Sequence, residues 1–170
     1  MAVVLGIALI IVGTFAWGAL RGAPWVPTRS RDIPRIIALA APRRGELAVD
    51  LGCGSGGVLA AFARVGCRVR GWELAILPWT WATFRLFRVR DARVMYGDFW
   101  SANLRDVDIV YAFLMPAVLE RLAEKLRREL SPGARVITYA WPLPGWTPIT
   151  NDRTPGRPAL SLYRVPEQSS

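Results

Sequence analysis

A glycine-rich turn after an apolar run is the part of this sequence best suited to chemistry. Residues 47–51 are apolar apart from Asp50 and predict a buried strand, and glycines follow at every second position, Gly52, Gly54 and Gly56. Glycine lets a backbone bend sharply and approach a ligand without intervening side chains. A helix that begins just beyond presents free N–H groups and the positive end of its dipole. The stretch therefore predicts a turn that binds a nucleotide or a nucleoside.

Three carboxylates near this turn discriminate between the ligands that would fit it. Asp50 stands two residues before Gly52, where it can orient the loop and face a cationic ligand. Glu73 ends the next expected strand and can accept hydrogen bonds from two ribose hydroxyls, which NAD and S-adenosylmethionine both carry. Asp98 follows a third strand, in a position suited to the amino group of an adenine. Together the three favour S-adenosylmethionine over NAD.

The glycine spacing alone leaves other nucleotides open, and the surrounding sequence weakens them. Residues 52–57 also match the dinucleotide pattern G-x-G-x-x-G, but a chain of 170 residues leaves little room for the substrate domain of a dehydrogenase. No Lys-Ser or Lys-Thr pair follows the glycines, which excludes a P-loop. We therefore expect S-adenosylmethionine as the cofactor. Its expected contacts are Asp50, Gly52, Cys53, Gly54, Gly56, Glu73, Leu74, Asp98 and Phe99.

Composition narrows the chemistry further. The chain has no histidine, which excludes a Ser-His-Asp triad and most catalytic zinc sites. Two cysteines, Cys53 and Cys67, are too few for a zinc cage or a disulfide framework. We therefore expect no metal site, and we expect both cysteines to be reduced thiols. The net charge of +9 comes almost wholly from arginine, since Lys125 is the only lysine. A basic surface suits nucleic acid, anionic lipid or an acidic protein, and charge alone does not choose among them.

Strands that alternate with helices must position these residues. Sequence periodicity predicts strands at 47–51, 67–73, 92–96, 107–113, 134–140 and 159–165, and helices at 32–41, 58–65, 78–90 and 117–130. This alternation is typical of an α/β fold with a Rossmann-like, doubly wound and mainly parallel sheet. The ligand crevice of such a sheet lies at the carboxyl ends of its strands, where the glycine turn, Glu73 and Asp98 all fall.

An apolar stretch precedes this domain. Residues 2–20 carry no charge, and as a helix they would span about 28 Å, close to the ~30 Å hydrocarbon core of a bilayer. Arginines follow the stretch and none precedes it, which predicts a single-pass membrane anchor with the catalytic domain on the cytoplasmic side. A cleaved signal peptide and a buried core helix are the alternatives. The expected organisation is an anchor at 1–21, a linker and rim at 22–30, a methyltransferase domain at 31–166 and a tail at 167–170.

Several further motifs stand in an order that resembles a known family. They are Trp25–Thr28, residues 43–56, Gly71–Leu74 followed by Pro78-Trp79, Gly97–Trp100, residues 119–137 and Trp141–Trp146. In this order they resemble a class I, seven-strand methyltransferase. More narrowly they resemble the membrane-anchored protein-lysine methyltransferases, a family that includes the mitochondrial enzymes acting on ATP synthase c-subunit and adenine nucleotide translocase, and shorter archaeal relatives. The sequence departs from the family at Ser55, where many relatives have an acid, and at Ala75, where they have a polar residue.

The resemblance implies two halves of an active site. The donor pocket would lie around the glycine turn, Glu73 and Asp98, and the acceptor rim would come from residues 25–28 and from the segment after Phe113. The acceptor-pocket candidates, none of them a general base, are Trp25, Pro27, Thr28, Met115, Pro116 and Trp141. The Asn/Asp-Pro-Pro-aromatic motif of amide and nucleobase methyltransferases is absent, since residues 112–116 read Ala-Phe-Leu-Met-Pro.

These features predict a protein-lysine N-methyltransferase that acts on a membrane or membrane-proximal protein. Methyl transfer from a sulfonium is an in-line displacement that depends on alignment more than on acid–base chemistry, so it needs no histidine. A pocket walled by Trp25, Met115 and Trp141 would desolvate a lysine and lower its pKa. The alternatives are a lipid or small-molecule methyltransferase, a catalytically silent membrane scaffold, and a nucleic-acid methyltransferase, which the scattered charge and the anchor disfavour. The sequence does not predict the oligomeric state.

Overall fold

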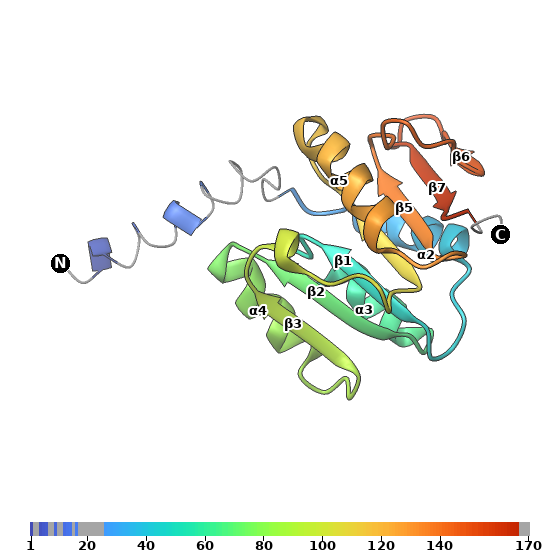
Figure 1. Cartoon of the computed structure of the whole chain (residues 1–170). Coiled ribbons are helices and arrows are strands. Elements are labelled where there is room, and N and C mark those ends of the chain that lie inside the picture. The colour runs from blue at the N-terminus through green and yellow to red at the C-terminus, as the bar shows by residue number, and fades with distance from the viewer. Residues whose placement is uncertain (2–3, 7–8, 10–11, 15, 17–25, 167–170) are drawn as a thin grey trace.

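Seven strands form one mixed sheet (Figure 1). The computed structural model describes residues 1, 4–6, 9, 12–14, 16 and 26–166. The strands are β1 (Leu47–Leu51), β2 (Arg68–Glu73), β3 (Ala92–Tyr96), β4 (Ile109–Ala112), β5 (Arg135–Tyr139), β6 (Thr150–Asp152) and β7 (Leu160–Arg164). They lie in the order β3-β2-β1-β4-β5-β7-β6, with β1 to β5 parallel and β7 antiparallel to both β5 and β6. The mainly parallel sheet predicted from the sequence is thereby confirmed.

Helices cover both faces of this sheet, so the fold is doubly wound (Figure 1). The helices are α2 (Ile33–Ala40), α3 (Gly57–Arg64), α4 (Ile76–Leu86) and α5 (Pro116–Glu129), with single 3₁₀ turns η1 (Ser30–Asp32) and η2 (Phe99–Ser101). Helices α2, α3 and α4 pack on one face and α5 on the other. Strand side chains alternate between the faces: Leu47 and Val49 of β1 point to the α5 side, and Ala48 points to the α3 side.

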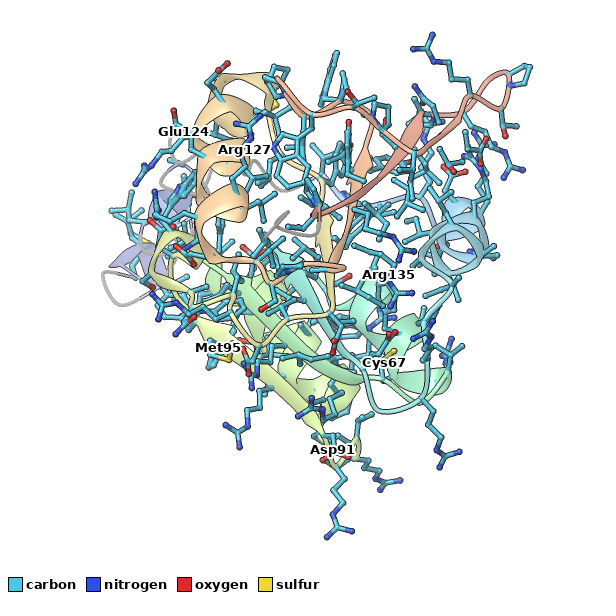
Figure 2. The ribbon with its side chains drawn as sticks, turned by 45° about the vertical axis from the view of Figure 1, so that its right-hand side comes forward. Cys67, Asp91, Met95, Glu124, Arg127 and Arg135 are labelled. Atoms are coloured by element: carbon cyan, nitrogen blue, oxygen red, sulfur yellow. The ribbon has the colours of Figure 1, made fainter. Side chains whose placement is uncertain are left out.

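Helix α2 shows how local sequence sets the ends of an element. Pro34 stands in its first turn, where the N–H that proline lacks has no partner in any case. Ala41 ends the helix in the left-handed region, with a φ of 43°. Arg135, at the start of β5, donates hydrogen bonds of 2.8 Å to the carbonyls of Ala40 and Ala41 (Figure 2). The carbonyls that a helix end leaves unpaired are therefore satisfied by the neighbouring strand.

The only lysine of the chain, Lys125, lies on the buried side of α5. Lys125 is 5% exposed, and its ammonium donates to the carbonyl of Ala102 at 2.6 Å and to both carboxylate oxygens of Glu129 at 2.8 Å. This network ties α5 to the segment after η2. The buried charge is tolerated because every donor bond is made to an acceptor of opposite or partial negative charge.

Two elements differ from the prediction. Helix α4 ends at Leu86, earlier than residue 90, because the chain turns into β3, and the N–H of Val89 bonds the carbonyl of Leu86 at 2.9 Å. Strand β6 was not predicted, because its three residues, Thr-Asn-Asp, carry no apolar pattern and stand between prolines. It is held by pairing with β7, a long-range contact that local sequence does not indicate.

Helix α4 presents an aromatic face to solvent. Trp81, Phe84 and Phe87, which we call the α4 stripe, are 57%, 66% and 63% exposed. Their rings form a ladder, with centroids 6.3 Å apart for the first pair and 5.6 Å for the second. The opposite side of α4 provides the core contacts, through Ala82 and Leu86.

The predicted single-pass membrane location is wrong for the part of the chain that the structure describes, and the anchor predicted at 1–21 falls mostly on residues outside that part. No helix among the described residues is long and apolar enough to span a bilayer. Within residues 2–20 the described helical positions are 4–6, 9, 12–14 and 16.

Candidate active site

A cavity opens at the carboxyl ends of β1, β2 and β4, the edge where the sequence places the ligand. Its walls come from the glycine turn, from these strand ends and from the segment before η1. The lining residues are Val26, Pro27, Thr28, Ile33, Asp50, Gly52, Cys53, Gly54, Ser55, Gly57, Val58, Glu73, Tyr111 and Phe113. Those that the sequence singled out are Pro27, Thr28, Asp50, Gly52, Cys53, Gly54 and Glu73.

The glycine turn adopts a backbone that other residues rarely adopt. Gly54 has a φ of 52° and Gly56 a φ of 74°, both in the left-handed region. A Cβ on Gly56 would lie 3.1 Å from the Cβ of Ala82 on α4 and 3.3 Å from its Cα. Gly56 therefore lets α3 begin in close contact with α4, and it does not line the cavity.

Glu73 joins the glycine turn to the end of β2. Its Oε2 accepts a hydrogen bond from the N–H of Gly54 and its Oε1 from the N–H of Ala75, both at 2.8 Å. Burial raises the pKa of the Glu73 carboxyl, although these two donors oppose the shift. Each carboxylate oxygen has a further lone pair, so Glu73 can hold the turn and still accept hydrogen bonds from ligand hydroxyls.

Asp50 lies beside Glu73 in a different environment. It is 4% exposed, and its carboxylate accepts no hydrogen bond from the described residues. Burial raises the pKa of Asp50 well above its usual range, and the charge of Glu73 adds to the shift. A cationic ligand would relieve both effects, because it favours the ionised carboxylate. The cavity is therefore suited to a ligand with positive charge.

Two hydroxyl groups meet in this cavity. Thr28 is one of the predicted acceptor residues, whereas Tyr111 was not predicted. Tyr111 on β4 and Thr28 before η1 share a hydrogen bond of 2.7 Å between their hydroxyl oxygens. Tyr111 lies opposite Asp50 in the parallel register, and burial raises the pKa of its phenol well above the usual value. It therefore stays neutral and can donate or accept. The available signal was one hydroxyl-bearing residue within the otherwise apolar strand β4.

Phe113 extends the cavity wall toward β5. Its ring packs edge-on against Tyr139, with centroids 4.7 Å apart. The Tyr139 hydroxyl donates a 2.8 Å hydrogen bond to Asp32, which is fully buried and also accepts one from Arg35 at 2.9 Å. The segment that carries Thr28 is therefore fixed to β5 through Asp32.

Other residues predicted for the donor lie outside this cavity. Asp98 accepts a hydrogen bond from the N–H of Trp100 at 3.0 Å and caps η2. Phe99 is 2% exposed and packs on Trp100, with ring centroids 4.6 Å apart. Leu74 is half-buried just after β2.

The predicted acceptor residues do not all lie in the cavity: Pro27 and Thr28 line it, and the others do not contribute to its described walls. Met115 and Pro116 stand exposed at the start of α5 and do not line the cavity. Trp141, which is 47% exposed, lines a separate groove beyond the end of β5. Trp25 lies outside the residues that the structure describes.

Comparisons with known proteins point to one family. Residues 50–150 match the family model of the ANTKMT methyltransferase domain. The chain is 39% identical to the adenine nucleotide translocase lysine N-methyltransferase of Mus musculus, over 74% of this chain and 56% of that protein. It is 35% identical to the Rattus norvegicus lysine N-methyltransferase of the ATP synthase c-subunit, over 78% of this chain and 61% of that protein. The chain thus spans between half and two thirds of these two relatives.

A solved structure has the same fold. An RNA methyltransferase from Salinibacter ruber, in complex with S-adenosyl-L-homocysteine, superposes with a TM-score of 0.79 at 24% identity. The match covers 85% of this chain and 97% of that one. At this identity the likeness shows the class I methyltransferase fold alone.

Proposed function

Because the chain belongs to the ANTKMT methyltransferase domain family, we propose that it transfers a methyl group from S-adenosylmethionine to the side-chain amine of a protein lysine. Family membership confirms the cofactor predicted from the sequence. The observation that carries the proposal is the cavity, where Asp50 and Glu73 lie beside the glycine turn and the Thr28–Tyr111 hydroxyl pair lies next to them. Lysine as the acceptor is supported by the names of the relatives, which are lysine N-methyltransferases.

The donor would occupy the glycine-turn side of the cavity. Glu73 would accept the ribose hydroxyls through lone pairs that the amides of Gly54 and Ala75 leave free. Asp50, buried without a hydrogen-bond donor of its own, would face the positive charge that S-adenosylmethionine carries on its sulfonium and ammonium groups. Asp98, at the neighbouring strand end, is proposed for the adenine.

The acceptor would enter on the Thr28–Tyr111 side. The reaction needs a neutral amine whose lone pair points at the methyl carbon, so that the N–C bond forms as the C–S bond breaks and the sulfonium leaves as the neutral thioether. Hydroxyl oxygens of Thr28 and Tyr111 would accept the amine N–H groups and aim this lone pair. The apolar wall of Phe113 and Val26 would favour the deprotonated amine by excluding water.

A finer part of the proposal concerns where the acceptor is found. We propose, as the sequence predicts, a lysine of a membrane or membrane-proximal protein. Support comes from apolar side chains near the N-terminus that are largely exposed: Val4 70%, Leu5 62%, Leu9 63% and Val12 64%.

Transfer of label to protein lysine tests the proposal. The purified chain is incubated with methyl-labelled S-adenosylmethionine in four separate reactions. Each reaction contains one kind of acceptor: a membrane-protein fraction, a soluble-protein fraction, a lipid extract or RNA. We expect label in membrane-fraction protein, located on lysine by mass spectrometry. Label confined to the lipid extract or to RNA would overturn the lysine assignment, and label confined to soluble protein would overturn its finer part.

A substitution in the cavity tests the roles assigned to its two halves. Tyr111→Phe should lower kcat/KM for protein acceptor roughly tenfold, because one aligning hydroxyl is lost, while the Kd of S-adenosylhomocysteine stays within about twofold. Tyr163→Phe is the matched control, since Tyr163 is also fully buried but bonds the N–H of Leu143, away from the cavity. Equal effects of the two substitutions would contradict a role for Tyr111 in alignment.

A further inference from the structure

A second hollow lies at the same edge of the sheet as the cavity. It is a groove between the end of β5 and the β6–β7 loop, lined by Trp141, Asn151, Arg153, Pro155 and Arg157 among others. A hydrogen bond of 2.8 Å from the N–H of Ala140 to the carbonyl of Ala159 closes the sheet beneath it. Nothing in the proposed transfer of the methyl group uses this groove.

The sheet order places the groove within reach of the cavity. Neighbouring strands lie about 4.8 Å apart, so the end of β5, two strands from β1, is roughly 10 Å from the glycine turn. The edge-on contact between Phe113 and Tyr139 lies between the two hollows, because Phe113 lines the cavity and Tyr139, at the end of β5, directly precedes Ala140 and Trp141 of the groove. A lysine side chain, with four methylene groups before its nitrogen, can bridge much of this distance. Residues beside the target lysine would then lie over the groove.

The groove carries two arginines, and only one of them forms an ion pair within the described residues. Arg153 is exposed and forms no ion pair within the described residues. Arg157 reaches Asp32 at 3.4 Å but keeps a third of its side chain exposed. The two acids in this region are already engaged, since Asp32 is buried and bonded by Arg35 and Tyr139, and Asp152 is bonded by Arg35 at 2.9 Å. An incoming carboxylate would therefore find the Arg153 guanidinium without a competing acid, and the exposed part of Arg157 beside it.

We propose that this groove binds the segment of the acceptor protein next to its target lysine, and that this segment is acidic. Its carboxylates meet Arg153 and Arg157, and its apolar atoms pack on the half-exposed ring of Trp141. The inference rests on the proposed function and adds the class of acceptor, a lysine flanked by aspartate or glutamate. Single-stranded nucleic acid fits less well, because it is bound by successive aromatic rings, and Trp141 is the only aromatic residue lining this groove in the described chain.

Peptides with a single lysine test this groove. Three fluorescein-labelled sets differ only in the flanks of the lysine, which are acidic, neutral or basic, and both binding and methylation are measured on the full chain. Acidic flanks should give the lowest Kd and KM. Arg153→Glu should remove this preference, raising the Kd of acidic peptides roughly fivefold or more, while the Kd of S-adenosylhomocysteine stays unchanged. Arg64→Glu is the matched control, since Arg64 is exposed at the far end of α3.

The outcomes separate the groove from the chemistry. All three peptide sets could be methylated with equal KM, both by the wild type and by Arg153→Glu. That result would contradict the proposed role of the groove and would still support the lysine methyltransferase activity. Binding that prefers acidic flanks and depends on Arg153, with no peptide methylated, keeps the groove and counts against lysine as the acceptor. Binding of a single-stranded oligonucleotide that is tighter than that of any peptide and is lost in Arg153→Glu overturns the proposal in favour of nucleic acid.

Discussion

The two carboxylates of the cavity end neighbouring strands, yet their surroundings give them different roles. Glu73 is held by two backbone N–H groups, so its charge is partly compensated before any ligand arrives. Asp50 has no such donors, and burial keeps the pKa of its carboxyl raised. The folded protein therefore holds a buried acid whose ionised form is stabilised only by a bound cation.

Asp50→Asn should stabilise the ligand-free protein and weaken donor binding. A carboxyl whose pKa is raised on folding binds protons more tightly in the folded state, so its contribution to stability is present below its ordinary pKa and is lost as pH rises through the folded value. At neutral pH the substitution should raise the free energy of unfolding by about 1 kcal/mol and raise the Kd of S-adenosylmethionine roughly tenfold. Urea unfolding across pH and calorimetric titration measure the two effects.

Asp91→Asn is the control for this prediction. Asp91 is exposed on the turn before β3, at the amino ends of the strands and away from the cavity (Figure 2). It should change neither the free energy of unfolding at neutral pH nor the Kd. A lower free energy of unfolding for Asp50→Asn at neutral pH would contradict this prediction. It would show that other groups of the folded protein stabilise the ionised Asp50 carboxylate.

At this scale the sequence predicted the carboxylates at the strand ends, and the family resemblance predicted Thr28, but neither predicted Tyr111 or its contact with Thr28. Asp50 and Glu73 follow from a parallel sheet alone, since the carboxyl ends of its strands meet at one edge. Tyr111 reaches the cavity because β4 pairs with β1, and Thr28 because its segment folds back over that edge. The spacing of residues along the chain predicts neither the pairing of β4 with β1 nor the position of the Thr28 segment.

At the scale of elements, one cluster of charged and polar side chains joins the segment before α2 to strands β5 and β6. Arg35 of α2 bonds Asp32 and Asp152, each at 2.9 Å, and Tyr139 of β5 donates to Asp32. Although burial opposes the shift, hydrogen bonds from Tyr139 and Arg35 lower the pKa of Asp32. Hydrogen bonds from Arg35 and Thr154 lower the pKa of Asp152 to about 2. The cluster therefore positions Thr28 over the cavity through charge as well as packing.

Asp32→Asn should lower the free energy of unfolding by about 3 kcal/mol, because it leaves Arg35 with one buried partner fewer. A carboxyl whose pKa is lowered on folding stabilises the protein above its ordinary pKa of 3.8, and this contribution is lost as pH falls below that value. The gap between wild type and variant should therefore close in acid. Chemical unfolding at pH values from neutral downward measures it.

Asp106→Asn provides the comparison, since Asp106 pairs with Arg70 at 2.9 Å but is 57% exposed. It should cost less than about 1 kcal/mol. Similar losses from the two substitutions would mean that burial adds nothing to the Asp32 cluster.

The element pattern itself was largely predictable. Apolar runs and turn residues indicated β1 to β5, β7 and helices α2 to α5, because each buries a face that its periodicity reveals. Two features were not available from local sequence. Strand β6 exists through its pairing with β7, and α4 ends where β3 must begin, so both are set by tertiary context.

For the whole molecule, the predictions of family, fold class and cofactor are confirmed, whereas the predicted membrane location is wrong, since no helix among the described residues is long and apolar enough to span a bilayer. Hydropathy of residues 2–20 measures only how apolar the stretch is. Among the described residues, the α4 stripe is an aromatic surface that stays exposed to solvent.

Replacing the α4 stripe with glutamine at Trp81, Phe84 and Phe87 should reduce concentration-dependent self-association without loss of stability. These rings are more than half exposed, so they contribute little to the core, while contiguous exposed aromatics favour association. Sedimentation velocity over a concentration series and thermal unfolding measure the two effects. A wild type that stays monomeric at every concentration, or a variant that unfolds markedly earlier, would contradict this prediction.

The burial of Lys125 has a consequence for a protein that would methylate lysines. With its ammonium bonded to Ala102 and Glu129 and only 5% of the residue exposed, the single lysine of the chain is withheld as a nucleophile. All remaining positive side chains are arginines, whose guanidinium groups stay protonated and do not attack a sulfonium. The molecule can therefore carry a strongly basic surface and handle a reactive methyl donor while offering no side-chain amine of its own for automethylation.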